Sequence, residues 1–330
     1  TAVTQKGLDP RNFILCTDDC HSGTLVNEGH MNRVVRHAID CGCDPLIAIQ
    51  MATINTACHF GLERELGSIT PGRRADFIVT SSIDDLPIEA VFARGEKVAE
   101  NGKLLTKCPH YQWPQSARET VNLGKKLKRE DFVISAPASL SSVSAKVIGV
   151  IENQAPTKAL EFDLPVKQGK VIAKGDVCYL SLVERHRGTG AVVNGFVSGF
   201  GYTGSMAIAS SVAHDSHHII VVGTNQDMMA FAANRLGEVG GGVSVWKDGA
   251  EVALVELPIA GLMSDSKASE VSVKAQAIVS AMIDCGCTLN NAYMQHTLLA
   301  LVVIPELRIS DLGLVDVNRF ELTEIIEQSS

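Results

Sequence analysis

The chain has 330 residues, of which 45% are hydrophobic and 20% are charged, so it can form two or three domains with ordinary hydrophobic cores. Its formal net charge is −8 at pH 7 and only 5% of its residues are aromatic, which argues against a general partner of nucleic acids or anionic membranes. No apolar run is long enough to span a bilayer, and we recognise no signal peptide before the first predicted strand.

The nine cysteines are scattered, and their number is odd. Two Cys-Gly-Cys pairs, Cys41 with Cys43 and Cys285 with Cys287, each follow a predicted helix. Neither pair has the two-residue spacing of a zinc knuckle or a redox motif. We therefore expect reduced cysteines without a metal role, in a cytoplasmic protein.

A short apolar strand, predicted over residues 12–16, leads directly into one hydroxyl and two carboxylates, those of Thr17, Asp18 and Asp19. In parallel α/β folds, the carboxyl ends of the strands carry the chemistry. The alternative is that Asp18 or Asp19 caps the next segment or begins a turn, where aspartate is common. The pattern alone leaves both interpretations open.

Two helices are predicted after this loop. The apolar residues between positions 31 and 39 fall on one helical face, and Gly42 ends the run. Asp44 and Pro45 begin a second helix, as N-cap and first-turn proline, which continues to about Gly61. Both helices present apolar faces, so we expect residues 1–68 to be poorly stable alone.

The pattern then changes from helices to strands, which are predicted over 75–79, 88–93 and 97–100. Residues 101–140 are polar and contain the basic run 125–129. This run indicates a solvated helix face or a linker, with a phosphate site as the less favoured alternative.

Strands dominate from about residue 141. They are predicted over 143–151, 170–183, 191–198, 219–222, 243–246 and 250–257, with helices over 225–239 and 267–284. Thr224 and Asp227 resemble a capping box for the first of these helices. Gly240–Gly242 follow that helix rather than precede it, so they indicate helix termination and not a phosphate cradle.

A group of titratable residues in this half invites a metal interpretation: His186, His214, Asp215, His217 and His218. Their spacing completes no zinc pattern. We favour a hydrogen-bonded polar cluster at a domain interface. The apolar loop 258–264 is compatible with packing near an active site or with a subunit contact.

Several segments together resemble one enzyme family. Thr-Asp-Asp at 17–19, Glu-Gly-His at 28–30, the stretch 44–55 and the stretch 67–76 resemble the last barrel strand and the following sandwich of the amidohydrolase superfamily. The second half is more specific, and its segments resemble the C-terminal domain of metal-dependent bacterial adenine deaminases. These segments are 183–190, 213–217, 223–225 and 257–264.

The resemblance implies an α/β chain that carries the C-terminal portion of such an enzyme and lacks most of the catalytic barrel, since a complete barrel takes about 250 residues. Residues 1–66 are expected to be the last strand and helices of a (β/α)8 metal-dependent hydrolase barrel, and residues 67–115 part of a β-sandwich. Residues 116–140 are then a linker, and residues 141–330 an α+β adenine-deaminase C-terminal domain.

The activity implied by the resemblance is hydrolytic deamination of adenine to hypoxanthine and ammonia in purine salvage, by a hydroxide that a metal activates. Such enzymes hold two metal ions with a His-x-His pair, a glutamate, two further histidines and an aspartate after the last strand. Only the aspartate is matched here, by Asp18, which is implied to be a metal ligand and the proton shuttle. No His-x-His occurs among the ten histidines. Manganese or ferrous iron suits this ligand set.

The loop after Asp18 is expected at the barrel mouth, where His21, Asp19 and Glu28 are candidates for binding the purine. Asp19 is the weaker metal ligand, because adjacent side chains at a strand end point in opposite directions. For His30 we favour helix capping or solvation. The expected partner is a small purine, in a homo-oligomer, without nucleic acid or membrane.

Two alternatives stay open. The chain can belong to an amidohydrolase that acts on another aminopurine or a cyclic amide. Because most metal ligands are missing, it can also be a non-catalytic module for binding or oligomerisation.

Overall fold

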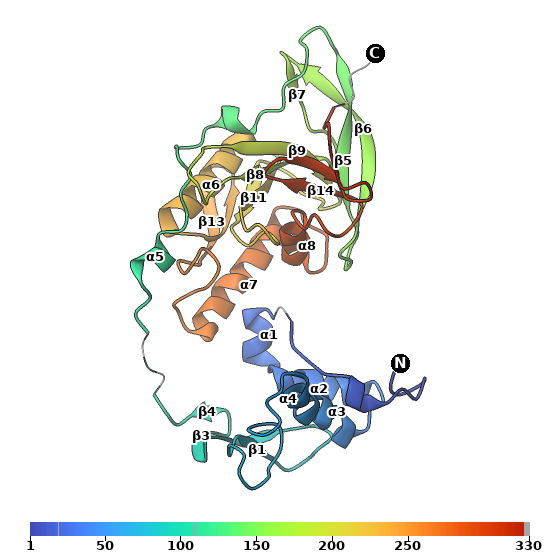
Figure 1. Cartoon of the computed structure of the whole chain (residues 1–330). Coiled ribbons are helices and arrows are strands. Elements are labelled where there is room, and N and C mark those ends of the chain that lie inside the picture. The colour runs from blue at the N-terminus through green and yellow to red at the C-terminus, as the bar shows by residue number, and fades with distance from the viewer. Residues whose placement is uncertain (19, 108, 110, 327–330) are drawn as a thin grey trace. The chain divides into compact units, whose positions relative to one another are not determined.

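The computed structural model describes residues 1–18, 20–107, 109 and 111–326 and divides the chain into two compact units, Thr1–Gln112 and Trp113–Ser330 (Figure 1). The described residues form helices together with three β-sheets, one of which has nine strands. This confirms the predicted mixed α/β character. Among the described helices, none combines the length and apolar character that crossing a bilayer requires.

The first unit begins with short helices: η1 (Pro10–Asn12), α1 (Ser22–Asn27), α2 (Met31–Asp40), α3 (Pro45–Ala52) and α4 (Ile54–His59). The predicted start at Asp44 is confirmed, because its Oδ1 accepts hydrogen bonds from Leu46 N at 2.9 Å and Ile47 N at 3.2 Å. The single helix predicted to run on to Gly61 is wrong. It breaks at Thr53, whose hydroxyl donates to the carbonyl of Ile49 at 2.6 Å.

The strand predicted over residues 12–16 is also wrong, since Pro10–Asn12 is a 3-10 turn and residues 13–18 have no regular structure. A parallel strand needs hydrogen-bonding neighbours, and no strand pairs with this segment in the described residues. Instead, Leu15 N donates to Met51 O at 3.1 Å. The Asn55 amide donates to the carbonyls of Pro10 and Phe13 at 2.8 and 3.0 Å, so α3 and α4 hold the segment.

The four-stranded sheet of this unit is an antiparallel meander of β1 (Phe77–Thr80), β2 (Ile88–Ala93), β3 (Glu96–Glu100) and β4 (Lys103–Leu104). Phe77 lies opposite Phe92 in register, and their rings stack at 4.5 Å. β2 and β3 are joined by a tight two-residue turn, in which Arg94 and Gly95 both have positive φ, of 53° and 83°.

The second unit contains the nine-stranded sheet, in the order β13-β12-β10-β11-β8-β9-β5-β6-β7. Every pairing is antiparallel except that of β5 with β9. The strands are β5 (Ser142–Val150), β6 (Thr157–Lys167), β7 (Lys170–Val171), β8 (Cys178–Val183), β9 (Val192–Ser198), β10 (Met206–Ser210), β11 (Ile219–Gly223), β12 (Gly242–Lys247) and β13 (Ala250–Glu256).

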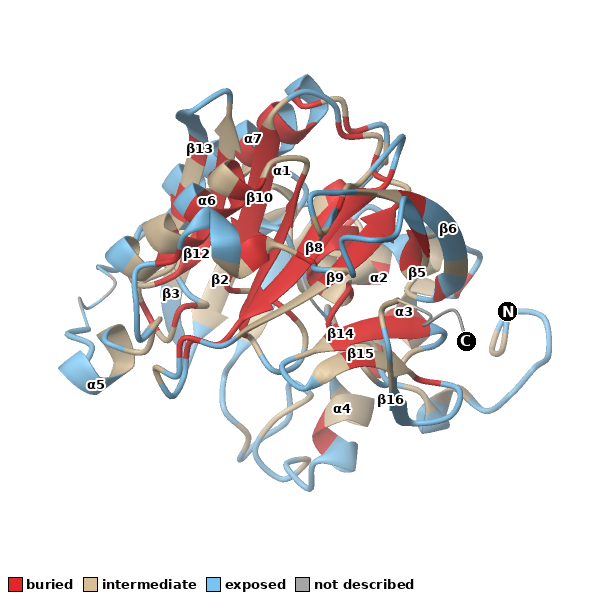
Figure 2. Cartoon of the chain, turned by 90° about the horizontal axis from the view of Figure 1, so that it is seen from above, coloured by how far each residue is buried: buried red, intermediate tan, exposed pale blue. Residues whose placement is uncertain are grey.

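Both faces of this sheet are covered, and Figure 2 shows the buried residues concentrated in its strands. Leu180 and Leu182 face a core that includes α7 (Ala268–Asp284) and α8 (Ala292–Leu298) and the small sheet of β14 (Leu307–Ser310), β15 (Gly313–Asp316) and β16 (Glu321–Thr323). Tyr179 and Val183, on the opposite face, pack in a core with α6 (Gln226–Val239). Alternate residues of one strand therefore enter different cores, which explains why β8 is apolar apart from Ser181, whose hydroxyl donates to Asn194 Oδ1 at 2.6 Å.

The segment that leads into this unit contains α5 (Gln115–Arg118) and η2 (Arg129–Phe132). Within the stretch that composition predicts to be a linker, Leu127, Phe132 and Ile134 are buried in the same core as α6. Leu127 is also fixed by a side chain of α6, because Asn234 Oδ1 accepts from Leu127 N and Asn234 Nδ2 donates to Leu127 O, both at 2.9 Å.

The C-terminal strands return to the beginning of the sheet. Thr157 in β6 donates its hydroxyl hydrogen to Leu307 O at 2.8 Å. The guanidinium of Arg308, which is 1% exposed, donates to the carbonyls of Ile304 and Leu298 at 2.8 Å and to that of Ala155. The bonds of Thr157 to Leu307 and of Arg308 to Ala155 join residues that are 150 and 153 positions apart in the sequence.

Helix α6 does not use the predicted capping box. Asn225 is the N-cap, and its side-chain oxygen accepts from Asp227 N at 2.9 Å and Met228 N at 3.3 Å. Thr224 instead bonds to β10, donating to Gly204 O at 2.6 Å and accepting from Met206 N at 3.0 Å. The predicted helix end is confirmed, because Gly240 adopts the left-handed conformation with φ 80°.

The buried carboxylate of Glu184 organises the loop between β8 and β9. It accepts hydrogen bonds from the backbone N–H groups of His186, Arg187 and Thr189, the last two at 2.7 and 3.0 Å, and from the Thr189 hydroxyl at 3.0 Å. Burial alone would raise the pKa of Glu184, but these hydrogen bonds together outweigh it and lower the pKa to about 2.

We expect Glu184→Gln to lower the free energy of unfolding at neutral pH by up to about 3 kcal/mol. The carboxylate stabilises the fold fully above its ordinary pKa of 4.5, and this contribution is lost as the pH falls from there toward 2. Urea unfolding at a series of pH values should therefore show the wild type and the variant converging in acid. Glu161→Gln, at an exposed position of β6, is the control; a constant difference at every pH would contradict the prediction.

Large apolar side chains of the first unit are exposed, among them Leu46 at 59% and Phe60 at 65%. Exposed apolar patches favour association. We expect the 330-residue chain to self-associate, and Leu46→Ser with Phe60→Ser to reduce that association, as measured by sedimentation velocity. The exposed polar change Glu65→Ser serves as control, and an unchanged distribution in the double variant would contradict this.

Candidate functional site

The predicted catalytic acid, Asp18, lies in the irregular segment that precedes α1, and its residue is exposed. Its φ of 52° is in the left-handed region, which aspartate tolerates better than most side chains do. Hydrogen bonds to two helices hold the residues just before Asp18. Leu15 N donates to Met51 O of α3, and the Asn55 amide of α4 donates to Phe13 O. The segment that leads into Asp18 is therefore held by hydrogen bonds to α3 and α4. Asp19 lies outside the residues that the structure describes.

The predicted purine-contacting residues lie at the two ends of α1. His21 is the N-cap residue, without a side-chain capping bond, and Glu28 is the C-cap residue. The seven helical rises between them separate their Cα atoms by about 10 Å. The Glu28 carboxylate accepts from Arg33 Nε at 2.7 Å in an exposed pair. The structure thus places His21 near Asp18 in the chain and gives Glu28 a cationic partner.

His30 occupies the N-cap position of α2 and is exposed, and its side chain makes no capping hydrogen bond, so of its two predicted roles the structure supports solvation. Asn32 takes over part of the capping role, and its Oδ1 accepts from His30 N at 2.9 Å. The required sharp bend is made by Gly29, with φ 109°.

The described residues do not assemble the ligands of a metal centre. In residues 1–18, 20–107, 109 and 111–326, no three side chains of His, Cys, Asp or Glu come together as a group that could hold a metal ion. Asp18 is a hard oxygen donor of the kind that manganese or ferrous iron accepts. A single carboxylate does not fit a complete centre, so no metal-dependent step can be assigned to this chain alone.

The second unit contains a different polar arrangement, centred on Arg185, which is 1% exposed. Its guanidinium donates to the carbonyl of His217, to that of Thr120 at 3.3 Å and to that of Ala260 at 3.1 Å. A Cβ on Gly261 would lie 2.7 Å from Nη1 of this guanidinium, so only glycine fits there. Arg185 thereby joins three segments that are far apart in the sequence.

The histidines predicted to form a polar cluster surround this guanidinium. His186 Nε2 lies 2.8 Å from Ser216 O, and the rings of His186 and His218 are 4.7 Å apart. Burial, followed by the neighbouring His186, lowers the pKa of His218, whose Nε2 is 3.6 Å from Asp311 Oδ2. Burial and then His214 lower the pKa of His217. The lowered pKa values favour the neutral form of His217 and His218 beside the buried cation, and the buried Nδ1 atom of each of these two rings has no hydrogen-bond partner.

Sequence reasoning missed Arg185. The available signal was its position two residues after the end of a fully buried strand, where a charged side chain has to turn inward or out to solvent. The sequence carried no sign of the three carbonyls that receive it, because they belong to separate loops.

The chain matches two protein families. Residues 3–100 match the Amidohydrolase family, and residues 154–321, just over half of the chain, match the Adenine deaminase C-terminal domain. The first match covers most of the unit that carries Asp18, and the second covers every strand of the nine-stranded sheet except β5, together with two of the three segments that Arg185 joins.

Curated relatives are similar over the same range. The chain is 72% identical over 327 residues to the adenine deaminase of Roseobacter denitrificans, covering 99% of this chain and 54% of the relative. It is 71% identical over 330 residues to that of Ruegeria pomeroyi, covering 99% and 55%, and 42% identical over 327 residues to that of Moorella thermoacetica, covering 98% and 55%. The chain spans about half the length of these relatives. It belongs to the family defined by the adenine deaminase C-terminal domain.

Proposed function

We propose that this chain is the C-terminal portion of an enzyme that hydrolyses adenine to hypoxanthine and ammonia. The observation that carries the proposal is the 72% identity to a relative named adenine deaminase, which runs through both units without a break in coverage. A chain so similar over 327 residues is expected to preserve the relative's chemistry in the part that it shares.

Asp18 is the residue to which we assign the proton transfers. Replacing the exocyclic amine of adenine by oxygen requires that a water molecule lose a proton as it attacks and that ammonia gain one as it leaves. An exposed carboxylate on an anchored loop can accept the first proton and deliver it to the leaving group. His21, which begins the next helix, and Glu28, at the end of that helix, are proposed to contact the purine.

The metal requirement follows from the amidohydrolase match. A bound metal lowers the pKa of water toward ~7, and manganese or ferrous iron is proposed here. The described residues contain no group of three ligands, so the remaining ligands are assigned to the part of the relatives that this chain does not span.

Residues 1–66 are accordingly proposed to be the end of the barrel, residues 67–115 part of the sandwich, and residues 141–330 a C-terminal domain. A cytoplasmic homo-oligomer that acts on a small purine completes the proposal.

One observation favours a second candidate for the chain in isolation. Because the described residues do not gather a metal site, the 330-residue chain by itself can act as a non-catalytic module for binding or assembly. An amidohydrolase that acts on another aminopurine or a cyclic amide differs from both, and relative rates on adenine and on a dihydropyrimidine would separate it from adenine deaminase.

The assignment of Asp18 can be tested in a fusion of this chain to the preceding half of the Roseobacter denitrificans relative. We expect Asp18→Asn to reduce kcat for ammonia release from adenine by about 100-fold or more, because the amide accepts no proton. Asp40→Asn, at the exposed end of α2, is the matched control. Turnover of the Asp18 variant at the rate of the control, with equal metal content, would remove Asp18 from the mechanism.

The incomplete donor set leads to a second expectation. The purified 330-residue chain, loaded with manganese or ferrous iron and then dialysed, should retain far less than one metal ion per chain and release no ammonia from adenine. Metal analysis and an ammonia assay check this. Stoichiometric metal together with turnover would show that the chain holds a complete site.

A further inference from the structure

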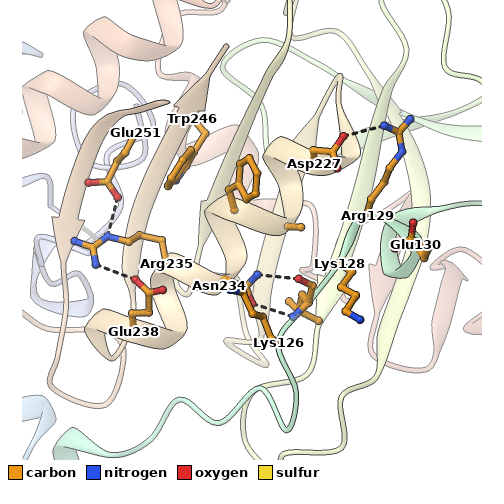
Figure 3. A pocket seen from close by; sticks show the side chains of 13 residues that line it. Lys126, Lys128, Arg129, Glu130, Asp227, Asn234, Arg235, Glu238, Trp246 and Glu251 are labelled. Carbon is orange, nitrogen blue, oxygen red and sulfur yellow. Dashed lines mark hydrogen bonds and ion pairs between the residues drawn. The ribbon is translucent and has the colours of Figure 1, made fainter. Parts of the chain in front are cut away.

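A groove of about 770 Å³ opens on the second unit, well apart in the sequence from the Asp18 loop. Its walls come from residues 126–130, which overlap the basic run, from helix α6 and from strands β12 and β13 (Figure 3). This volume lies in the range of small-molecule sites. The sequence is compatible with two roles for the basic run, a solvated face or a phosphate site. The structure shows which residues lie opposite to it.

Two aromatic side chains line the groove, in a protein in which aromatic residues are scarce. Phe231 of α6 is 43% exposed, although it is a large apolar side chain, and its ring centroid is 5.3 Å from that of Trp246 in β12. The Trp246 indole N–H donates to Ser244 Oγ at 2.9 Å, so its polar edge is already satisfied and its ring is left for apolar contact. Such a pair is suited to stack a planar heterocycle.

Both sides of the groove carry charges of both signs, but in different proportions. Figure 3 shows Glu238 and Glu251 with Arg235 on one side, and Lys128, Arg129, Glu130 and Asp227 on the other. Arg235 is shared between the two carboxylates, at 3.1 Å from Glu238 and 2.8 Å from Glu251. The side next to Trp246 and Arg235 is therefore net acidic, with carboxylate oxygens left over as acceptors.

The other side retains unpaired positive charge. Arg129 is neutralised by Asp227 at 2.8 Å, but Lys126 takes part in none of the ion pairs within the part of the chain that the structure describes. Lys128 lies near Asp131, which already pairs with Lys125 at 2.6 Å. Glu130 also lines this side and reduces the excess. Lys126 and Lys128 are the cations available to an anion.

The groove is held in shape by the bidentate contact of Asn234 with the Leu127 backbone, at 2.9 Å in both directions. Leu127 is 2% exposed, so it anchors the segment while Lys126 and Lys128 on either side project from it. A preformed wall lowers the entropic cost of binding.

We propose that this groove binds a purine nucleotide that carries an exocyclic amino group, such as AMP. The base stacks on Phe231 and Trp246, its amino group donates to the carboxylates of Glu251 and Glu238, and the phosphate lies between Lys126 and Lys128. Acceptors at the base end, aromatic rings in the middle and lysines at the phosphate end match the three parts of such a ligand in order. The site is independent of the proposed deaminase reaction.

Calorimetric titration of the 330-residue chain with AMP tests the proposal, with IMP and inorganic pyrophosphate as comparison ligands. We expect saturable binding of one AMP per chain, weaker binding of IMP, which lacks the amino group, and weaker binding of pyrophosphate, which lacks the base. Quenching of tryptophan fluorescence by AMP, absent from Trp246→Phe, would locate the ligand in the groove.

The double variant Lys126→Glu with Lys128→Glu should bind AMP at least about tenfold more weakly. Lys158→Glu with Lys167→Glu, two exposed positions of β6, changes the net charge equally and should bind as the wild type does. Thermal melts confirm that each variant is folded. The absence of saturable AMP binding, pyrophosphate binding as tight as AMP, or equal loss in both double variants would overturn the proposal.

Discussion

The buried guanidinium of Arg185 is the interaction on which the arrangement of the second unit's loops depends. Its hydrogen bonds go to backbone carbonyls of three segments, around Thr120, His217 and Ala260. A desolvated cation is costly unless its donors are satisfied, so the three loops have to stay together as long as Arg185 is inside. The preceding residue, Glu184, fixes its own loop by accepting hydrogen bonds from backbone N–H groups. Two adjacent side chains therefore hold the loops at one end of the sheet.

The fold could be predicted where a residue pattern is compatible with only one kind of local structure. Strands β8 and β11 are buried on both faces, and such strands are uninterrupted apolar runs. Strand β10 is equally buried, but its Met-Ala-Ile-Ala-Ser sequence has a single β-branched residue and was not recognised. Strand β6 was missed because it contains several charged residues and few of its residues are buried. Residues 12–16 show the opposite error, since an apolar run does not specify the strands that would have to pair with it.

The candidate sites differ in how much of them the sequence carries. Asp18 follows from the resemblance to one family, since an Asp-Asp pair after an apolar run is ambiguous by itself. The groove was not predictable, because Leu127 and Asn234 are 107 positions apart and only the fold joins the basic run to an aromatic pair. The nucleotide proposed there and the adenine proposed at Asp18 share a base.

The closure of the second unit by its last strands has a consequence for biosynthesis. Thr157 and Leu307 are 150 positions apart, and Arg308 reaches back to Ala155. Contacts of such sequence separation form late and slow folding. While the chain is being translated, β6 therefore leaves the ribosome long before the segment that secures it, and this unit stays incomplete until Leu307 and Arg308 have emerged.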